Sequence, residues 1–467
     1  MKNTTYDVAI IGSGPGGYVC AIRLAQLGKR VVIIEKNHNY GGTCLNVGCI
    51  PSKALLHASL IYENSKYKYS DMGIETNSKI NLQKMHEYKE GVVQSNTNGI
   101  KYLFKKNKIE TINGFGEIIN SNEILIKNED SKITINATTI ILATGSVPNR
   151  LNDIEIDEKN ILSSTGALSL DRIPKNLIIV GAGYIGIELG SVWMRLGSKV
   201  KFIEYSDKIL PETDQEAALT LKKNLEKKGM EFMLNKKLVN IDKSKNGLTI
   251  FIEDAKSGQK EDIKADVVLL SIGRKPNTEG LGIENVGIET DSKGRIHVDK
   301  NFKTNISNVY AIGDVIKGPM LAHKAEEEAV AVAEIISGKY GHVNYSVIPS
   351  VIYSEPEIAS VGLTEEELKN KKIDYSIGKF PFIANGRAKV NQETDGFVKI
   401  LADKLSDKVL GVHIIGSDAG TLIGEAAIAM EFGASSEDIA LTCHAHPTLN
   451  ESIKEAALDV NNRAIHI

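Results

Sequence analysis

Two segments of the chain show the same order of apolar strand, glycine-rich turn and amphipathic helix. In the first segment, residues 6–11 form a β-branched apolar run, residues 12–17 are rich in glycine, and residues 18–27 have helical periodicity. A second apolar run at residues 30–34 follows and ends in Glu35. This order of patterns predicts one βαβ unit.

The second segment repeats that order far along the chain. Residues 176–180 and 199–203 predict two strands, which flank a glycine-rich turn at 181–186 and a helix at 187–196. Glu204 ends the unit, as Glu35 ends the first. The copies lie roughly 170 residues apart, whereas solenoid repeats recur about every 20–50 residues. We therefore expect two doubly wound domains rather than a repeat array.

The rest of the chain predicts further strands and a third domain. Runs at 140–145, 267–273 and 309–314 are typical of buried strands that end in glycine or a carboxylate. Residues 61–110 are polar with helical spacing, which favours a solvated helical excursion. From about residue 345 short strands alternate with helices. The expected fold class is α/β, with two Rossmann-like dinucleotide-binding domains and a C-terminal α+β domain.

Composition and charge narrow the classes of function. The 467 residues are 42% hydrophobic and 25% charged, which excludes a protein that is mainly disordered, collagen-like or coiled coil. A net charge of −3 argues against nucleic-acid and membrane-surface partners, because both require a basic face. The four cysteines (Cys20, Cys44, Cys49 and Cys443) are too few for a disulfide-stapled secreted scaffold.

The pattern of residues at the start of the chain bears on the cellular compartment. Residues 1–7 are polar and run directly into an apolar strand, without the basic, apolar and small-residue regions of a targeting segment. Residues 177–194 are the best candidate for a membrane span, but Glu188 and four glycines favour a strand, a turn and a helix instead. We expect a cytoplasmic protein without a membrane span.

The two glycine-rich turns both match the dinucleotide-binding fingerprint G-x-G-x-x-G. Its first glycine permits a tight turn, the second lets a pyrophosphate approach the backbone, and the third lets helix and strand pack closely. The phosphates then lie at a helix N-terminus. A single match is weak, but here each match follows a strand, opens a helix and precedes an acidic residue. The glycines concerned are Gly12, Gly14 and Gly17 in the first turn, and Gly181, Gly183 and Gly186 in the second.

Glu35 and Glu204 stand where a carboxylate accepts hydrogen bonds from ribose hydroxyls. Glu204 would repel a 2′-phosphate, and residues 202–208 contain no arginine to bind one. The second nucleotide is therefore expected to be NAD(H) rather than NADP(H). Two different dinucleotides in one chain suggest that electrons pass from one to the other.

Cys44 and Cys49 form the second candidate for chemistry, and three interpretations compete. Zinc binding is disfavoured by the spacing and by the lack of a second Cys or His pair nearby in the sequence, so no metal site is expected. The second interpretation is two inert buried thiols, and the third is a redox-active disulfide, since disulfides in cytosolic proteins are usually catalytic or regulatory. In a regular helix these Cα atoms would lie about 8.6 Å apart, beyond the roughly 7 Å that a disulfide spans. A bond therefore requires a helix that is distorted or begins between them, which Gly48 permits.

The segment 41–53, Gly-Gly-Thr-Cys-Leu-Asn-Val-Gly-Cys-Ile-Pro-Ser-Lys, resembles the signature of the flavoprotein disulfide reductases. The resemblance extends over residues 7–451. Ser52 and residues 444–448 are most similar to the branch that oxidises dihydrolipoamide as the E3 component of 2-oxo acid dehydrogenase complexes. Two positions depart from the family pattern, because Asn450 stands where serine is common and Ala329 where glycine is usual.

The resemblance implies FAD in the first domain and NAD in the second. Lys53 is implied to lie beside the flavin with Glu188 as its ion-pair partner, and Tyr184 to cover the flavin until nicotinamide displaces it. The implied FAD contacts are Gly12, Gly14, Gly17, Glu35, Lys53, Gly116, Thr144, Gly145, Ser146, Asp314, Met320, Leu321, Ala322 and His323. The implied NAD contacts are Gly181, Gly183, Tyr184, Gly186, Glu188, Glu204 and Gly273.

The family pattern also implies a domain order and partners. Residues 1–146 would bind FAD, 147–275 would bind NAD, 276–343 would complete the FAD domain, and 344–467 would form the dimer interface. The implied partners are a second copy of the chain, and the lipoyl domains and E2 core of 2-oxo acid dehydrogenase complexes or the glycine cleavage H protein.

His446 is the candidate general base. A lone histidine is more often structural, but Glu451 follows at a distance that suits an orienting carboxylate, which fixes the imidazole tautomer. The resemblance implies a cis bond before Pro447 and a reaction in which His446 deprotonates a dihydrolipoamide thiol that attacks Cys44. Cys49 is then released as a thiolate, and electrons pass through FAD to NAD⁺. Two alternatives stay open: a reductase or diaphorase with another acceptor, and a flavin-loaded binding subunit without turnover.

Overall fold

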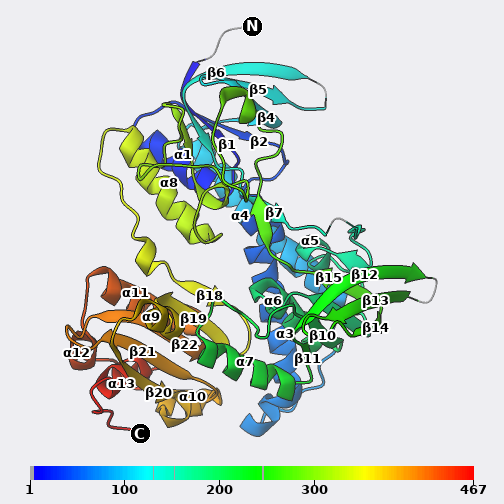
Figure 1. Ribbon diagram of the computed structural model, residues 1–467, viewed down its shortest axis with the longest axis vertical. Helices are drawn as coiled ribbons and strands as arrows, with labels where there is room; N and C mark the ends of the chain where they lie inside the picture. Colours follow the sequence, from blue (N-terminus) through cyan, green and yellow to red (C-terminus); the bar gives the residue numbers. More distant parts are fainter. Residues whose placement is uncertain (1–4, 130, 152, 245–246) are drawn as a thin grey trace.

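The computed structural model describes residues 5–129, 131–151, 153–244 and 247–467. Figure 1 shows three lobes: β1, β2 and β4–β6 with α1 and α8 at the top, the sheet around β9–β15 in the middle, and β18–β22 near the C-terminus. Each lobe is built on its own sheet.

The first sheet has the strand order β3-β2-β1-β6-β5-β4, and β17 also pairs with β6. The pairs β1–β2, β1–β6, β2–β3 and β6–β17 are parallel. Strand β2 and the second half of β1 are buried, whereas β3 is mostly exposed at the edge of the sheet. Helix α8 packs against α1, so a segment more than 300 residues away completes this lobe. Its elements are β1 (Thr5–Ile11), α1 (Pro15–Gln26), β2 (Val31–Glu35), β3 (Glu110–Asn113), β4 (Phe115–Asn120), β5 (Glu123–Lys127), β6 (Lys132–Leu142), η2 (Glu284–Val286), β17 (Val309–Ala311), η3 (Gly313–Val315) and α8 (Ala322–Ile336).

The second sheet has the order β11-β10-β9-β15-β8 and is parallel throughout. A three-stranded antiparallel sheet and a two-stranded one lie beside it. The elements are β7 (Ser146–Pro148), β8 (Ile161–Leu162), α5 (Ser164–Ala167), β9 (Asn176–Val180), α6 (Tyr184–Leu196), β10 (Lys199–Ile203), α7 (Gln215–Lys227), β11 (Glu231–Met233), β12 (Lys236–Ser244), β13 (Gly247–Asp254), β14 (Lys260–Ala265), β15 (Val267–Leu270) and β16 (Arg274–Pro276). The stretch 177–194 thus forms strand, turn and helix, as its glycines and Glu188 predicted.

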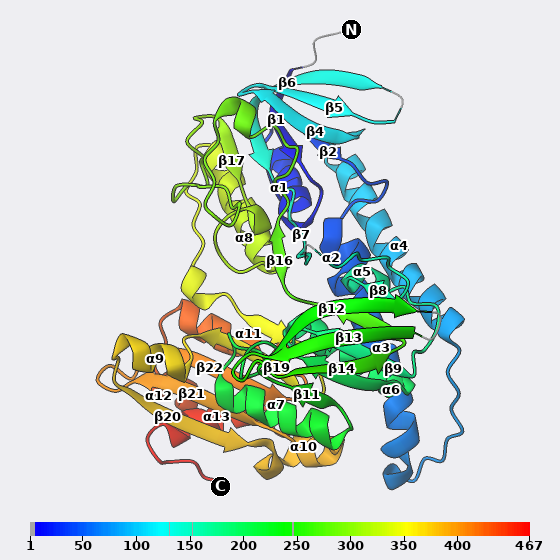
Figure 2. The ribbon, with the colours of Figure 1, turned by 45° about the vertical axis from the view of Figure 1, so that its right-hand side comes forward.

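The polar segment 61–110 is helical over most of its length, in two long helices that link the first and second lobes (Figure 2). Leu55, Leu56 and Met85 from these helices share one apolar core with Trp193 of α6. The helices are α2 (Gly42–Val47), α3 (Cys49–Tyr67), η1 (Tyr69–Met72) and α4 (Leu82–Lys106). Among the described residues, Gly42–Tyr67 is the only helical stretch long and apolar enough to cross a membrane by length and composition. It bends at Gly48 and packs on α4 and α6.

The C-terminal lobe is an antiparallel sheet of order β18-β19-β22-β21-β20 with helices against it, as the α+β pattern predicted. Lys399 of β21 is buried and lies 2.8 Å from the buried Asp214, the N-cap of α7, which ties this lobe to the second. The elements are η4 (Tyr345–Val347), β18 (Ser350–Ile352), β19 (Glu357–Gly362), α9 (Glu365–Lys371), β20 (Tyr375–Pro381), η5 (Phe382–Ala384), α10 (Gly386–Asn391), β21 (Phe397–Asp403), β22 (Val409–Gly416), α11 (Ala419–Glu431), α12 (Ser436–Leu441) and α13 (Glu451–Asp459).

Candidate active site

A cavity of about 1540 Å³ runs between the first two lobes and reaches the C-terminal lobe at Tyr353 and Gly420. It exceeds the roughly 300–1,000 Å³ of a site for a single drug-sized ligand. Both glycine-rich turns and both cysteines of the 41–53 segment line it. Of the residues implied to bind nucleotides, only Gly17 and Gly186 lie outside the lining.

The two turns have the geometry that the fingerprint requires. Gly12 and Gly181 have φ of +102° and +100°, in the left-handed region that favours glycine. A Cβ on Gly17 would lie 2.0 Å from the Gly12 carbonyl oxygen, and one on Gly186 would lie 2.4 Å from that of Gly181. These third glycines therefore close the turn, which explains their absence from the cavity wall.

The second glycine of each turn has a different role. A Cβ on Gly14 would come no closer than 3.9 Å to another atom, and one on Gly183 would have nothing within 4 Å. Both residues are N-caps without a side chain, and both line the cavity, so no side chain fills the space beside the first free N–H groups of α1 and α6. This open space at a helix N-terminus fits the pyrophosphate of a dinucleotide.

The two carboxylates at the strand ends lie at the cavity wall and already make hydrogen bonds. Glu35 accepts bonds from the amide and hydroxyl of Ser13 at 3.0 and 2.7 Å, and from the amide of Asn37 at 2.9 Å. Glu204 accepts bonds from the amides of Ala182 and Ser206 at 2.7 and 2.8 Å. These contacts fix both carboxylates beside the turns, where ribose hydroxyls would lie.

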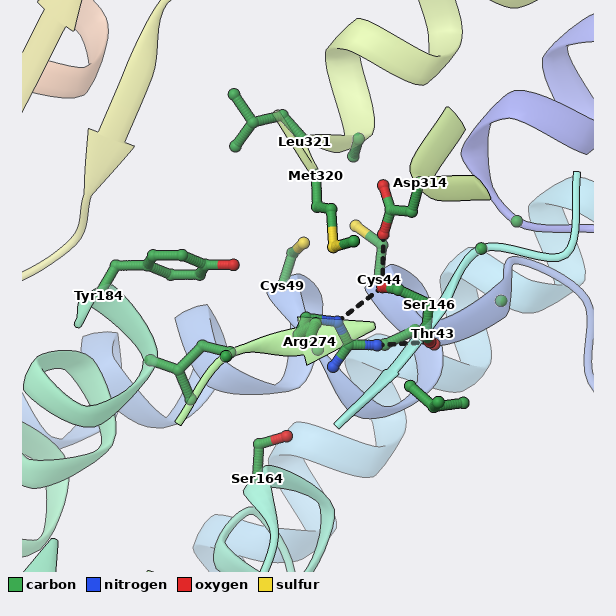
Figure 3. Close-up of a pocket in the computed structure, with 18 of the residues that line it drawn as sticks. Thr43, Cys44, Cys49, Ser146, Ser164, Tyr184, Arg274, Asp314, Met320 and Leu321 are labelled. Atoms are coloured by element: carbon green, nitrogen blue, oxygen red, sulfur yellow. Dashed lines mark hydrogen bonds between the residues drawn. The ribbon is translucent and has the colours of Figure 1, made fainter. Parts of the chain in front are cut away.

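Asp314, Ser146 and Arg274 form a polar chain across the cavity (Figure 3). The Ser146 hydroxyl donates to Asp314 Oδ2 at 2.6 Å, and Arg274 Nε donates to the Ser146 hydroxyl at 2.7 Å. Arg274 follows Gly273 directly, so the chain connects the end of the second sheet to the Asp314 turn of the first lobe. Arg274 was not among the residues predicted from the sequence. A cationic side chain directly after Gly273, which was predicted to contact NAD, could have indicated it.

Cys44 and Cys49 meet where two helices join. Cys44 lies in α2, and α3 begins at Cys49 after the irregular Gly48, whose φ and ψ are −143° and −114°. The helical stretch is therefore broken at Gly48, between the two cysteines, which is the kind of irregularity that a disulfide between them would require. Both are thiols here, hydrogen-bonded to each other, and their sulfur atoms face the same space as that of Met320 (Figure 3).

The two thiols have opposite acidities. The hydrogen bond with Cys44 is the largest of the effects that lower the pKa of Cys49 to about 7, and the Lys53 ammonium adds to it, while burial and Glu188 oppose the shift. The same hydrogen bond, together with burial, raises the pKa of Cys44. Cys49 also begins α3, where the helix dipole favours an anion. The pair can therefore hold one thiolate and one proton near neutral pH.

Lys53 lies one turn along α3, and its Nζ lies 2.8 Å from Glu188 Oε2 of α6, as the resemblance implied. The second oxygen of Glu188 accepts a bond from the amide of Tyr353 at 3.1 Å. The ring of Tyr353 also lies beneath the ammonium, at 4.4 Å from its centroid to Nζ. Tyr353 has no motif of its own, so the sequence analysis missed it.

His446 and Glu451 lie away from the cavity of their own chain, since neither lines it. His446 Nδ1 lies 2.9 Å from Glu451 Oε1, and the amide of Thr448 donates to Glu451 Oε2 at 2.9 Å. Burial opposes ionisation of Glu451, but the bonds from Thr448 and His446 lower its pKa below the usual value. The His446–Pro447 bond is cis. The His446 side chain is 78% exposed, so Nε2 is free to meet a substrate from outside.

Asn450, one of the two departures from the family pattern, does not bind Glu451. Its side-chain amide donates to Glu425 at 2.6 Å, and the other oxygen of Glu425 lies 2.7 Å from His444 Nε2. The described bonds that hold Glu451 come from His446 and Thr448 rather than from the Asn450 side chain.

Known proteins with similar sequences identify the family. The model of the pyridine nucleotide-disulphide oxidoreductases matches residues 6–329, and the model of their dimerisation domain matches residues 348–457. The chain belongs to the pyridine nucleotide-disulphide oxidoreductases. As in this family of flavoprotein disulfide oxidoreductases, its cofactors are FAD and NAD(H). The fit of the two helix N-termini to dinucleotides agrees with this assignment.

Relatives and solved structures of this family cover almost the whole chain. A mitochondrial dihydrolipoyl dehydrogenase of Arabidopsis thaliana is 52% identical over 99% of this chain and 91% of its own length. Dihydrolipoyl dehydrogenase 3 of Pseudomonas putida is 51% identical over 99% of this chain and all of its own length. The crystal structure of LpdA from Mycobacterium tuberculosis has a TM-score of 0.90 at 26% identity, covering 97% of this chain and 99% of that one. The expected fold class is confirmed, and the dimerisation domain indicates a homodimer.

The expectation of a cytoplasmic protein is wrong by the same comparison. The relatives from Arabidopsis, pea and Dictyostelium are named mitochondrial, whereas one relative is bacterial. The expectation rested on the polar residues 1–7. Because targeting segments are removed from mature chains, a polar start carries no information about the compartment.

Proposed function

We propose that this protein is a dihydrolipoyl dehydrogenase, which oxidises dihydrolipoamide to lipoamide and reduces NAD⁺ to NADH. The observation that carries the proposal is the Cys44–Cys49 pair, whose thiols have divergent pKa values at the wall of a cavity that fits two dinucleotides. The relatives named dihydrolipoyl dehydrogenase support the same activity. Such an enzyme needs one cysteine that accepts the substrate thiolate and another that leaves easily.

The reaction begins at the histidine. His446 Nε2 takes a proton from one substrate thiol. Glu451 accepts a hydrogen bond from the Nδ1–H group of His446, so Nε2 is the nitrogen that remains free to accept the proton. The substrate thiolate attacks the Cys44 sulfur of the oxidised pair. A bond forms between substrate and Cys44, the Cys44–Cys49 bond breaks, and Cys49 leaves as a thiolate. Its pKa of about 7 makes it the better leaving group.

The second substrate thiol completes the exchange. It attacks the substrate sulfur of the mixed disulfide, so lipoamide forms and Cys44 is expelled. The raised pKa of Cys44 makes this sulfur retain a proton. Lys53 stabilises the remaining Cys49 thiolate and is itself held by Glu188. One substrate dithiol has then become a disulfide. The protein disulfide has become the Cys44 thiol, which takes the proton of the second substrate thiol, and the Cys49 thiolate, while the proton of the first substrate thiol is on His446.

The chain's residues suit the two dinucleotides. FAD supplies the route by which the electron pair of the reduced cysteines reaches NAD⁺ as hydride. The turns at Gly14 and Gly183 would bind the two pyrophosphates, and Glu35 and Glu204 the riboses. The remaining FAD residues would be Lys53, Gly116, residues 144–146, Asp314 and residues 320–323, and the remaining NAD residues would be Tyr184, Glu188 and Gly273. We propose that residues 1–146 and 276–343 bind FAD, 147–275 bind NAD, and 344–467 form the interface.

We also propose that each active site is shared between two copies of the chain. His446 is exposed and lies outside the cavity that Cys44 and Cys49 line. A second copy that contributes its own His446 would complete the site. In this arrangement the lipoyl domain of an E2 core, or of the glycine cleavage H protein, would deliver dihydrolipoamide from the dimer side.

Mixing two inactive homodimers tests the shared site. A Cys49→Ser dimer and a His446→Gln dimer are mixed under conditions that exchange subunits. Half of the dimers are then mixed, and each regains one intact site, which predicts recovery of about a quarter of the wild-type activity. Cys49→Ser mixed with Cys44→Ser is the control and recovers none, because both cysteines come from one chain. Mixed dimers without recovery contradict the shared site.

Anaerobic titration tests the function itself. The FAD-containing protein is reduced with dihydrolipoamide, the free thiols are counted, and NAD⁺ is added. We expect two new thiols per chain and one NADH per dithiol consumed. A protein that accepts electrons from NADH but not from dihydrolipoamide would instead be a diaphorase or a reductase of another disulfide.

A further inference from the structure

Tyr353 interacts with both members of the Lys53–Glu188 pair. It follows β18 in the C-terminal lobe, whereas Lys53 lies in α3 and Glu188 in α6. Its amide donates to Glu188 Oε1 at 3.1 Å, and its ring lies 4.4 Å from Lys53 Nζ. Three elements that are distant in sequence thus meet at one ammonium group.

We propose that Tyr353 is a positioning residue for the disulfide chemistry, because its ring holds the Lys53 ammonium where it stabilises the Cys49 thiolate. The inference rests on the proposed function, since it assigns a role to Lys53 in that reaction. It extends the site to a lobe that supplies neither Cys44 nor Cys49.

The physical basis is that the Tyr353 ring restricts where the flexible Lys53 side chain places its charge. A lysine side chain has four rotatable bonds, and the side chain of Lys53 is 33% exposed, so water competes for its ammonium. Glu188 fixes the ammonium from one side only. The electron-rich face of Tyr353 attracts the ammonium from another side without removing its charge. The backbone bond from Tyr353 to Glu188 holds the carboxylate as well.

Four charged or titratable groups face Tyr353 from the elements packed around it: Lys53, Glu188, Cys49 and Glu357. Of these, only Lys53 favours an anion at Cys49, and Glu188 opposes one. If the ammonium moves toward water, Cys49 keeps the opposing carboxylate and loses the favourable cation. The thiolate of Cys49 should then form at higher pH.

The test compares Tyr353→Leu with Tyr353→Phe. Each FAD-containing dimer carries Cys443→Ser to remove an exposed thiol, is reduced with a dithiol and is freed of it. The ultraviolet absorbance of the thiolate is then titrated. The Phe variant keeps the ring and should titrate like the parent. The Leu variant keeps the backbone bond but loses the ring, and at about pH 6 its thiolate fraction should fall by about three- to tenfold.

A double variant separates this effect from a general loss of structure. If Tyr353 acts through Lys53, then Tyr353→Leu should change nothing further in a Lys53→Met background. An additive shift, or a Leu variant that titrates like the parent while retaining FAD and dimer, overturns the inference. Neither outcome changes what is expected for dihydrolipoamide oxidation by the wild type. The proposed function is tested by the anaerobic titration with dihydrolipoamide, so the two proposals can fail independently.

Discussion

The Nζ atom of Lys53 lies 2.8 Å from Oε2 of Glu188, across a sequence separation of 135 residues. This ion pair joins α3, which begins at Cys49, to α6, which begins at the second glycine-rich turn. Its two charges act on the Cys49 thiolate in opposite directions. The pair therefore connects the cysteine pair to the helix that begins at the second glycine-rich turn.

Substitution of either member should shift the pKa of Cys49 with opposite sign. Lys53→Met removes a cation and should raise this pKa above about 7, whereas Glu188→Gln removes an anion and should lower it. We expect a change of about one unit in each case. Titration of the thiolate absorbance in the reduced dimer measures both. Shifts in the same direction would show that the pair acts through its geometry rather than its charges.

Alanine substitutions at the second and third glycines of the turn 181–186, which we propose binds NAD, should have different effects. A Cβ at Gly183 meets no atom within 4 Å, so Gly183→Ala should keep the parent Tm but bind NADH at least about tenfold more weakly, because the methyl group occupies the phosphate position. Gly186→Ala places its methyl 2.4 Å from the Gly181 carbonyl oxygen and should lower Tm. Calorimetry and NADH titration distinguish the two, and equal losses of Tm would contradict the assignment.

The two βαβ units were predictable because local patterns determine them. The strands at 176–180 and 199–203 have the predicted bounds. The helices begin earlier than expected, at Pro15 and Tyr184 rather than at residues 18 and 187, because their first turns are formed by the fingerprint itself. A helix whose first turn contains glycine lacks the apolar periodicity that marks its start.

Residues fixed by tertiary packing left no such pattern. Tyr353 reaches Lys53 because the C-terminal sheet shares an apolar core with α3 and α6, and Arg274 is linked to Asp314 through Ser146. Spacing along the chain does not encode such contacts. The resemblance supplied the pairing of Lys53 with Glu188, which spacing could not. It also supplied most of the expected FAD and NAD contacts, nearly all of which line one cavity.

The contact between Lys399 and Asp214 should be needed for the attachment of the C-terminal lobe. Both side chains are buried, and their N–O distance is 2.8 Å. Lys399→Met would leave the carboxylate buried without its cation, which costs about 3–5 kcal/mol. Scanning calorimetry should show a lower Tm. Addition of Asp214→Asn should restore part of the loss, because it removes the uncompensated charge and keeps an oxygen to cap α7. A double variant less stable than Lys399→Met would refute this account.

Glu357 should make the stability of the protein depend on pH. It lies in β19, and the amide of Gly420 donates to its Oε2 at 2.8 Å. Burial, with smaller effects of Glu355, Asp418 and Glu188, raises its pKa from 4.5 to about 7. Below pH 4.5 the group is neutral in both folded and unfolded chains. Between 4.5 and about 7 the unfolded chain releases the proton first, so stability falls as pH rises, and above about 7 the loss is complete.

Glu357→Gln should remove this dependence. The amide cannot ionise, yet its oxygen can still accept the bond from Gly420. At about pH 8 the variant should be more stable than the parent by about 2–3 kcal/mol, whereas at about pH 4.5 the two should be equal. Thermal unfolding at both pH values measures the difference, and Glu279→Gln, at an exposed site, serves as the control. A gain that is equal at both pH values would mean that folding does not raise the pKa of Glu357, because only a raised folded-state pKa produces a gain confined to high pH.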